Sequence, residues 1–218
     1  MKFTFVPTNE QEMNELLEKR TVLAEQTGLK GGKMSSLSHL KSSLFDWRVE
    51  HNWDPKSKDT RHVLVAKDEN GEIAGGTFFT YSKREPKITS FRHIFLFEEY
   101  RGNGIAEALY NVRYKMAVEA GCAYIRLFAN IPAYDWHLGV GMRFFGISKT
   151  KLPFGFVPIL PGASNMKELG RMLDQLGPEK VKEMIKAPLM KQMAAVEKKG
   201  GRWMTQEELD YGWKKSSV

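Results

Sequence analysis

Cysteine is nearly absent from this sequence, and long apolar runs are missing. Cys122 is the only cysteine in 218 residues, so no disulfide can form within the chain. This favours a reducing setting, and we expect a cytoplasmic protein in which Cys122 is a buried small hydrophobic residue. No run approaches the roughly 20 apolar residues of a membrane span, and no secretion signal follows Met1, so we expect no membrane partner.

Acidic residues are outnumbered by basic ones. Lysine and arginine total 33 against 26 aspartates and glutamates, which leaves a net charge of +7. A basic surface attracts anions, including phosphorylated cofactors and nucleic acid. The positive charges are scattered, however, and are not interleaved with aromatic residues, so we do not expect a nucleic-acid partner.

One glycine-rich segment has the pattern of an anion-binding turn. Arg101-Gly102-Asn103-Gly104-Ile105-Ala106 follows an apolar run, residues 88–97, and precedes a helix-like run, residues 107–120. The N–H groups at a helix start have no helical partner and carry partial positive charge, and glycines let a phosphate approach them closely. The dinucleotide-binding fingerprint is excluded because it needs glycine or alanine where Glu107 stands.

Periodicity and turn signals predict alternating strands and helices. Residues 61–66 and 72–81 should form a hairpin with an Asn70-Gly71 turn. Residues 88–97, 103–120 and 123–129 should form a strand–helix–strand unit with parallel strands. The other elements expected up to residue 160 are a strand at 2–6, helices at 8–27, from about 35 toward 49 and at 133–142, and strands at 143–150 and 154–160.

After Pro161-Gly162 the sequence pattern changes from alternating strands and helices to helices alone. We expect a helix over residues 165–176, a second from Pro178 to the break at Gly200-Gly201, and a third that begins with a capping box at Thr205 and ends near Trp213. Because short helices are marginal alone, these should dock on the rest of the chain or on a second copy, as a homodimer.

The turn also resembles the pyrophosphate-binding signature of the GNAT family of N-acetyltransferases, Arg/Gln-x-x-Gly-x-Gly/Ala. The segment 96–102 resembles the end of the family's fourth strand, and Asn130 to Met142 resembles its Asn-x-x-Ala-x-x-Leu-Tyr-x-x-x-Gly-Phe pattern. The resemblance implies an α+β fold over residues 1–160, with a mixed central sheet whose fourth and fifth strands splay apart. Residues 161–218 would be a helical C-terminal extension without a counterpart in the family.

The resemblance implies acetyl-CoA as co-substrate and no metal. Backbone groups of Ile94, Phe95 and Leu96 would bond the pantetheine arm, with the Leu96 N–H polarising the thioester carbonyl. The pyrophosphate would lie on the backbone of the turn and the helix start, formed by Arg101, Gly102, Asn103, Gly104, Ile105 and Ala106. The plainer alternative is that the two glycines only form a tight turn.

Proton transfer is less well defined by the sequence. His137 stands where the family often has a tyrosine that protonates the departing thiolate. With an ordinary pKa of about 6.5, it could act as an acid, bind substrate, or make only a structural hydrogen bond. Tyr134, one helical turn earlier, is the reserve acid, or else a packed aromatic residue. A thiolate could also leave unaided.

Further assignments follow from strand alternation and from the resemblance. Alternation points Arg92 to the side of Ile94 and Leu96, where it could bind an acidic group of the acceptor, or else form an ordinary ion pair. Asn130 would contact the cofactor or, more simply, cap the next helix. His93 and Glu98 are the titratable candidates for a base, and the acceptor loops would be residues 28–36 and 151–155.

The leading hypothesis is transfer of an acetyl group from acetyl-CoA to an amine, on a small molecule or a protein, by direct attack in a ternary complex. The alternative is a non-catalytic member of the fold that binds acyl-CoA or another protein.

Overall fold

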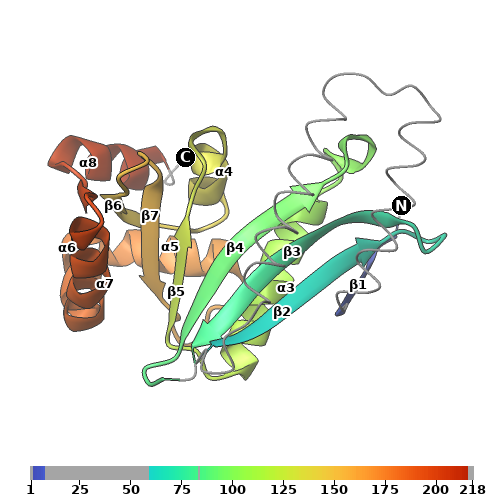
Figure 1. Cartoon of the computed structure of the whole chain (residues 1–218), viewed down its shortest axis with the longest axis horizontal. Helices are drawn as coiled ribbons and strands as arrows, with labels where there is room; N and C mark the ends of the chain where they lie inside the picture. Colours follow the sequence, from blue (N-terminus) through green and yellow to red (C-terminus); the bar gives the residue numbers. More distant parts are fainter. Residues whose placement is uncertain (1, 8–58, 83, 216–218) are drawn as a thin grey trace. The chain divides into compact units, whose positions relative to one another are not determined.

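The computed structural model describes residues 2–7, 59–82 and 84–215. Within these residues the strands form one eight-stranded mixed sheet, in the order β1-β2-β3-β4-β5-β7-β6-β8 (Figure 1). The strands are β1 (Thr4–Pro7), β2 (Asp59–Lys67), β3 (Ile73–Ser82), β4 (Ile88–Leu96), β5 (Tyr124–Phe128), β6 (Phe144–Ile147), β7 (Pro153–Pro158) and β8 (Arg202–Trp203).

After β4, the described helices are interspersed with the strands, and they dominate the C-terminal part of the chain. They are the 3-10 helices η1 (Glu98–Tyr100) and η2 (Ile131–Ala133) and the α-helices α3 (Ile105–Glu119), α4 (Tyr134–Gly139), α5 (Met166–Leu176), α6 (Pro178–Met184), α7 (Lys186–Lys198) and α8 (Gln206–Lys215). The helices expected over residues 8–27 and 35–49 lie outside the described residues, as does the 28–36 loop.

The chain divides into two compact units. The first comprises Met1–Lys83 and Arg92–Val112, and the second comprises Arg84–Phe91 and Arg113–Val218. Both β4 and α3 therefore contribute to each unit. The sequence predicted a different division, between a domain over residues 1–160 and an extension over residues 161–218. That boundary stays a prediction.

In the first unit, β2 and β3 pair as an antiparallel hairpin, as the Asn-Gly signal predicted. The turn is tied by Asp68, whose Oδ1 accepts hydrogen bonds from the N–H groups of Asn70 and Glu72, each at 2.9 Å. Three buried side chains form a core cluster beside this hairpin, namely Val65, Ile73 and Phe97, with Val6, Val63 and Tyr100 packed against them.

In the second unit, β4 and β5 pair in parallel, with Ile88 opposite Tyr124 and Ser90 opposite Arg126, which confirms the predicted strand–helix–strand unit. β7 pairs with β5 along the whole of β5 and with β6 on its other side, antiparallel to both. The α+β class with a mixed sheet is confirmed. The splay of β4 and β5 beyond these pairs stays a prediction.

The C-terminal helices correct one expectation and confirm another. The single helix predicted after Pro178 is in fact α6 and α7, which meet at Ile185. Pro188 explains the break, because its nitrogen cannot donate to the carbonyl of Met184 and its ring would collide with that carbonyl. The capping box at the start of α8 is present: Thr205 N–H donates to Glu208 Oε2 at 2.8 Å, and Glu208 N–H donates to Thr205 Oγ1 at 3.3 Å.

Candidate functional site

The glycine turn joins η1 to α3 and is exposed along its whole length, residues 101–104. Gly102 and Gly104 have φ of +81° and +72°, a backbone conformation that disfavours any side chain, and a Cβ placed on either would meet no atom of the described residues within 4 Å. The first α-helical bond runs from Ala108 N–H to Gly104 O at 3.0 Å. Donors before Ala108 therefore have no acceptor within the helix, and no other described residue fills the space beside the two glycines.

Two side chains close the turn and anchor it. Asn103 Nδ2 donates to the carbonyl oxygens of Tyr100 and Arg101, both at 3.3 Å, so its amide stabilises the turn itself. Tyr100 Oη donates to Asp68 Oδ2 at 2.9 Å. Asp68 is the residue that ties the β2–β3 turn, so the glycine turn is coupled to a hairpin 32 residues earlier. Neither Tyr100 nor Asp68 was predicted as a site residue, because no sequence signal joins them.

The alternation of side chains along β4 stays a prediction. Arg92 is exposed and Ile94 and Leu96 are half-buried, whereas Phe91 is buried. Leu96 and Ile94 belong to the same compact unit as the glycine turn. The side chains of His93, Phe95 and Glu98 lie outside the described residues.

Asn130 lies at the N-cap position of η2, but its exposed side chain makes no capping hydrogen bond, so the capping role is wrong. The reason is local. A capping side chain accepts from the second or third N–H of a helix; here the second residue is Pro132, which has none. The third N–H, that of Ala133, donates to the backbone oxygen of Asn130 at 2.9 Å.

His137 is buried in α4, with 9% of its surface exposed. Its ring lies 5.0 Å from that of Trp136 and 6.5 Å from that of Phe144. Burial, assisted by the positive charge of Arg113, lowers the pKa of His137 to about 3. At neutral pH the side chain is a neutral imidazole, which disfavours the imidazolium acid considered from the sequence.

Tyr134 packs between β6 and the C-terminal helix. Its ring lies 4.8 Å from that of Phe144 and 6.4 Å from that of Tyr211. Burial, followed by the nearby Tyr211, raises the pKa of Tyr134 to about 12. An ordinary thiol has a pKa of about 8.5, so this phenol would give its proton to a thiolate only uphill. The geometry favours the packing role over the acid role.

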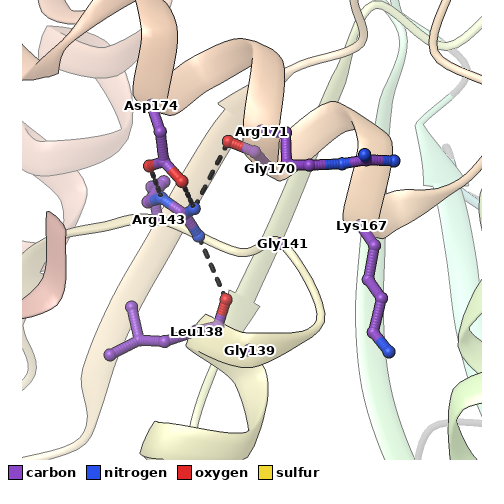
Figure 2. A pocket seen from close by; sticks show the side chains of 8 residues that line it. All are labelled: Leu138, Gly139, Gly141, Arg143, Lys167, Gly170, Arg171 and Asp174. Atoms are coloured by element: carbon purple, nitrogen blue, oxygen red, sulfur yellow. Dashed lines mark hydrogen bonds and ion pairs between the residues drawn. The ribbon is translucent and has the colours of Figure 1, made fainter. Parts of the chain in front are cut away.

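A pocket of about 260 Å³ lies where the α4–β6 connection meets α5 (Figure 2). Its lining residues are Leu138, Gly139, Gly141, Arg143, Lys167, Gly170, Arg171 and Asp174. The backbones touch at one side of it: a Cβ on Gly141 would lie 1.9 Å from the oxygen of Met166, and one on Gly170 would lie 2.5 Å from the Cα of Gly141. The glycine of the family-like motif, Gly141, therefore serves to seat α5.

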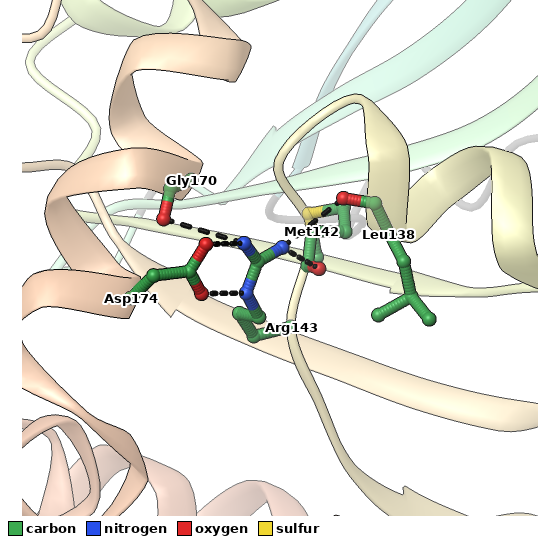
Figure 3. Close-up of polar contacts among 5 residues, drawn as sticks. All are labelled: Leu138, Met142, Arg143, Gly170 and Asp174. Carbon is green, nitrogen blue, oxygen red and sulfur yellow. Dashed lines mark hydrogen bonds and ion pairs between the residues drawn. The ribbon is translucent and has the colours of Figure 1, made fainter. Parts of the chain in front are cut away.

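Arg143 holds this junction together (Figure 3). Its Nε and one terminal nitrogen donate to the two oxygens of Asp174 at 2.8 and 2.6 Å. Its terminal nitrogens also donate to three backbone oxygens, those of Leu138 at 3.1 Å, Met142 at 2.7 Å and Gly170 at 3.3 Å. Five bonds match the five N–H donors of a guanidinium, so Arg143 is fully used in joining α4 to α5. We therefore interpret the pocket as a structural junction.

Comparison with family models matches residues 33–142, about half of the chain, to the acetyltransferase (GNAT) family. The chain belongs to this family. Acetyl transfer is accordingly the activity class of the protein, and the match contains the glycine turn, α3, β5 and α4.

Several solved GNAT and other acetyltransferase structures are similar to the chain. An acetyltransferase of the GNAT family from Staphylococcus aureus Mu50 is 16% identical, with 73% of this chain and 100% of that chain covered and a TM-score of 0.47. The PaiA N-acetyltransferase of Thermoplasma acidophilum, in complex with coenzyme A, is 15% identical, with 73% and 100% covered and a TM-score of 0.48. An acetyltransferase of Trypanosoma brucei is 14% identical, with 65% and 93% covered and a TM-score of 0.43.

Comparison with curated proteins gave no match. Among the described residues, no helix combines the length and the apolar character needed to cross a membrane.

Proposed function

We propose that this protein transfers an acetyl group from acetyl-CoA to an amine, by direct attack of the amine nitrogen on the thioester carbonyl in a ternary complex. The observation that carries the proposal is the exposed glycine turn at the start of α3. Bound acetyl-CoA supplies the acetyl group as an activated thioester, and the chain supplies the groups that hold and orient it.

The turn fits a pyrophosphate. Gly102 and Gly104 adopt positive φ, and no other part of the described chain crowds them, so phosphate oxygens would reach the N–H groups from Gly102 to Ala106. The helix dipole and the exposed Arg101 guanidinium add positive charge at the same place. Asn103 and Tyr100 hold the turn in this shape, so little ordering remains to be done on binding.

The strand before the turn would hold the rest of the donor. We propose that backbone groups of Ile94, Phe95 and Leu96 bond the pantetheine arm and that the Leu96 N–H stabilises negative charge developing on the carbonyl oxygen. Arg92, exposed on the same side of β4, would bind an acidic group of the acceptor. Asn130, whose side chain makes no cap, would contact the cofactor.

The proton steps follow from the surroundings of α4. Because His137 is neutral at neutral pH, we propose that it acts as a hydrogen-bonding imidazole. Water would take the proton that the amine nitrogen loses, and the departing thiolate would take its proton from water. Tyr134 supports α4 by packing. The same observation favours a second candidate, a non-catalytic acyl-CoA-binding module, because burial suppresses acid–base chemistry on α4.

A matched pair of glycine variants tests the donor site. Gly104→Asp places a carboxylate at the proposed pyrophosphate site, and we expect acetyl-CoA affinity to fall by at least about 100-fold, or roughly 2.7 kcal/mol. Gly121→Asp is the control, because Gly121 follows the other end of α3 with φ +71° and equally open space. Its acetyl-CoA affinity should match that of the wild type, measured by titration calorimetry.

Turnover is measured as free thiol released from acetyl-CoA in the presence of a panel of amines and peptides. Amine-dependent release by the wild type supports the transferase. Binding of acetyl-CoA without release for any acceptor would favour the binding module, and a wild-type protein that does not bind acetyl-CoA would refute the proposal.

A further inference from the structure

We infer that the C-terminal helix α8 is a positioning element of the acetyl-transfer site, acting through three consecutive residues, Tyr211, Gly212 and Trp213, that fix α4. The inference rests on the proposed function, because α4 carries His137. It gives a role to a part of the chain that lies beyond the family match.

α4 needs support from outside. It is only six residues long, Tyr134–Gly139, and no side chain caps its start at Ala133. A helix of this length has little stability of its own. The direction in which it presents His137 must therefore be set by what packs around it.

Tyr211 and Gly212 hold the first turn of α4. Tyr211 Oη donates to Asp135 Oδ1 at 3.1 Å, and its ring stacks on that of Tyr134 with an interplanar angle of 15°. Gly212 is buried, and a Cβ placed on it would lie 3.0 Å from Tyr134 Oη and 3.6 Å from Leu138 Cδ2. Glycine is an unfavourable residue inside a helix, yet here any side chain would press on the Tyr134 hydroxyl, which would have to move by a few tenths of an ångström.

Trp213 holds the end of α4 through an intermediary. Its ring is 8% exposed and lies 6.2 Å from that of Phe145 and 5.7 Å from the Arg143 guanidinium carbon. Arg143 in turn donates to the carbonyl oxygen of Leu138. Residues 211–213 thus restrain both ends of α4, and hence the rotation of the helix about its axis, which aims His137.

The test uses two glycine-to-alanine variants of the full chain. Gly212→Ala pushes a methyl group against the Tyr134 hydroxyl, whereas Gly139→Ala, at the end of α4, adds one into open space. At a temperature where both are folded, we expect Gly212→Ala to lower kcat at least fivefold with the acetyl-CoA Kd within twofold of the wild type. It should also move the NMR titration of His137 toward the ordinary value of about 6.5. Gly139→Ala should change none of these.

A second substitution separates positioning from general damage. Tyr134→Phe removes the atom that the new methyl group meets, so the double variant Gly212→Ala/Tyr134→Phe should recover at least half of the kcat lost in Gly212→Ala. Lack of any recovery would overturn the inference. So would a folded Gly212→Ala protein with wild-type kcat and an unmoved His137 titration.

Two further outcomes remain informative. If Gly212→Ala does not fold, Tyr211→Phe removes only the hydrogen bond to Asp135, and we expect a kcat about threefold lower; an unchanged kcat would overturn the inference. If the wild type turns over no amine, the proposed function fails, and the His137 titration in Gly212→Ala still decides whether α8 fixes α4.

Discussion

The glycine turn at residues 101–104 and the segment 134–145, from α4 into β6, are built in opposite ways. The turn is exposed and offers backbone N–H groups whose direction is set by two positive φ angles. The α4–β6 segment is largely buried and depends on side chains, and its structure is set by Arg143, Phe144 and the helices of the extension.

The difference shows where each part draws its chemistry. A backbone donor keeps its dipole whatever surrounds it, so the turn needs only the correct local conformation. The properties of a titratable side chain depend on its environment: the pKa of His137 falls to about 3 because it is buried beside Arg113. Predictions for the two regions therefore differ in the residues that are substituted and in the quantity that is measured.

The largest effect is expected at the Arg143–Asp174 pair, whose arginine side chain is 2% exposed. Arg143→Met removes the bidentate partner of the Asp174 carboxylate and one donor from each of three backbone oxygens. We expect the free energy of unfolding to fall by about 3–5 kcal/mol, measured by denaturant titration. The control, Arg171→Met, removes an exposed arginine from the same pocket wall and should cost less than about 0.5 kcal/mol. Equal losses would contradict the role given to Arg143.

The next effect is a pH dependence of stability. Because the pKa of His137 is about 3 in the folded chain and about 6.5 when unfolded, the unfolded state binds more protons below pH 6.5. The free energy of unfolding should therefore fall on acidification, by about 1.5 kcal/mol between pH 6.5 and 5.

His137→Gln cannot titrate and should lack this part of the slope. The comparison of the two proteins is needed because burial also lowers the pKa of His62. The range stays above pH 5 because the pKa of Glu208, lowered to about 2 by its bond to Arg202, adds a loss of stability at lower pH. Parallel slopes for the two proteins would show that His137 is solvated in the folded state.

The same contrast explains what could be predicted from the sequence. Local sequence signals predict the glycine turn, the β2–β3 hairpin and the parallel β4–β5 pair. These signals are the glycine spacing, the Asn70-Gly71 dipeptide and the apolar periodicity. The state of His137 could not be predicted, because its lowered pKa depends on burial in the folded chain and on the charge of Arg113, which belongs to α3. The same holds for Asp174, which lies 31 residues from Arg143. By contrast, two prolines are local signals in the sequence. Pro188 indicates the break between α6 and α7, and Pro132 indicates that Asn130 does not cap the next helix.

The smallest effect is expected from removing either of two tyrosine–aspartate hydrogen bonds, one in each compact unit. Tyr100 donates to Asp68 at 2.9 Å beneath the glycine turn, and Tyr211 donates to Asp135 at 3.1 Å on α4. Loss of one such bond is typically worth about 1 kcal/mol, or roughly fivefold. Tyr100→Phe should loosen the turn, so we expect the acetyl-CoA Kd to rise about fivefold with kcat at saturation unchanged.

Tyr211→Phe is the matched control, with the opposite pattern: a lower kcat and an unchanged Kd. Calorimetric titration and saturation kinetics on both variants separate the two responses. If Tyr100→Phe lowered kcat as well, or if both variants weakened acetyl-CoA binding, the two regions would not act independently. If Tyr100→Phe changes only the Kd and Tyr211→Phe changes only kcat, the hairpin serves donor binding and α8 serves the transfer step. Each hydroxyl then acts only on the segment that its own aspartate anchors.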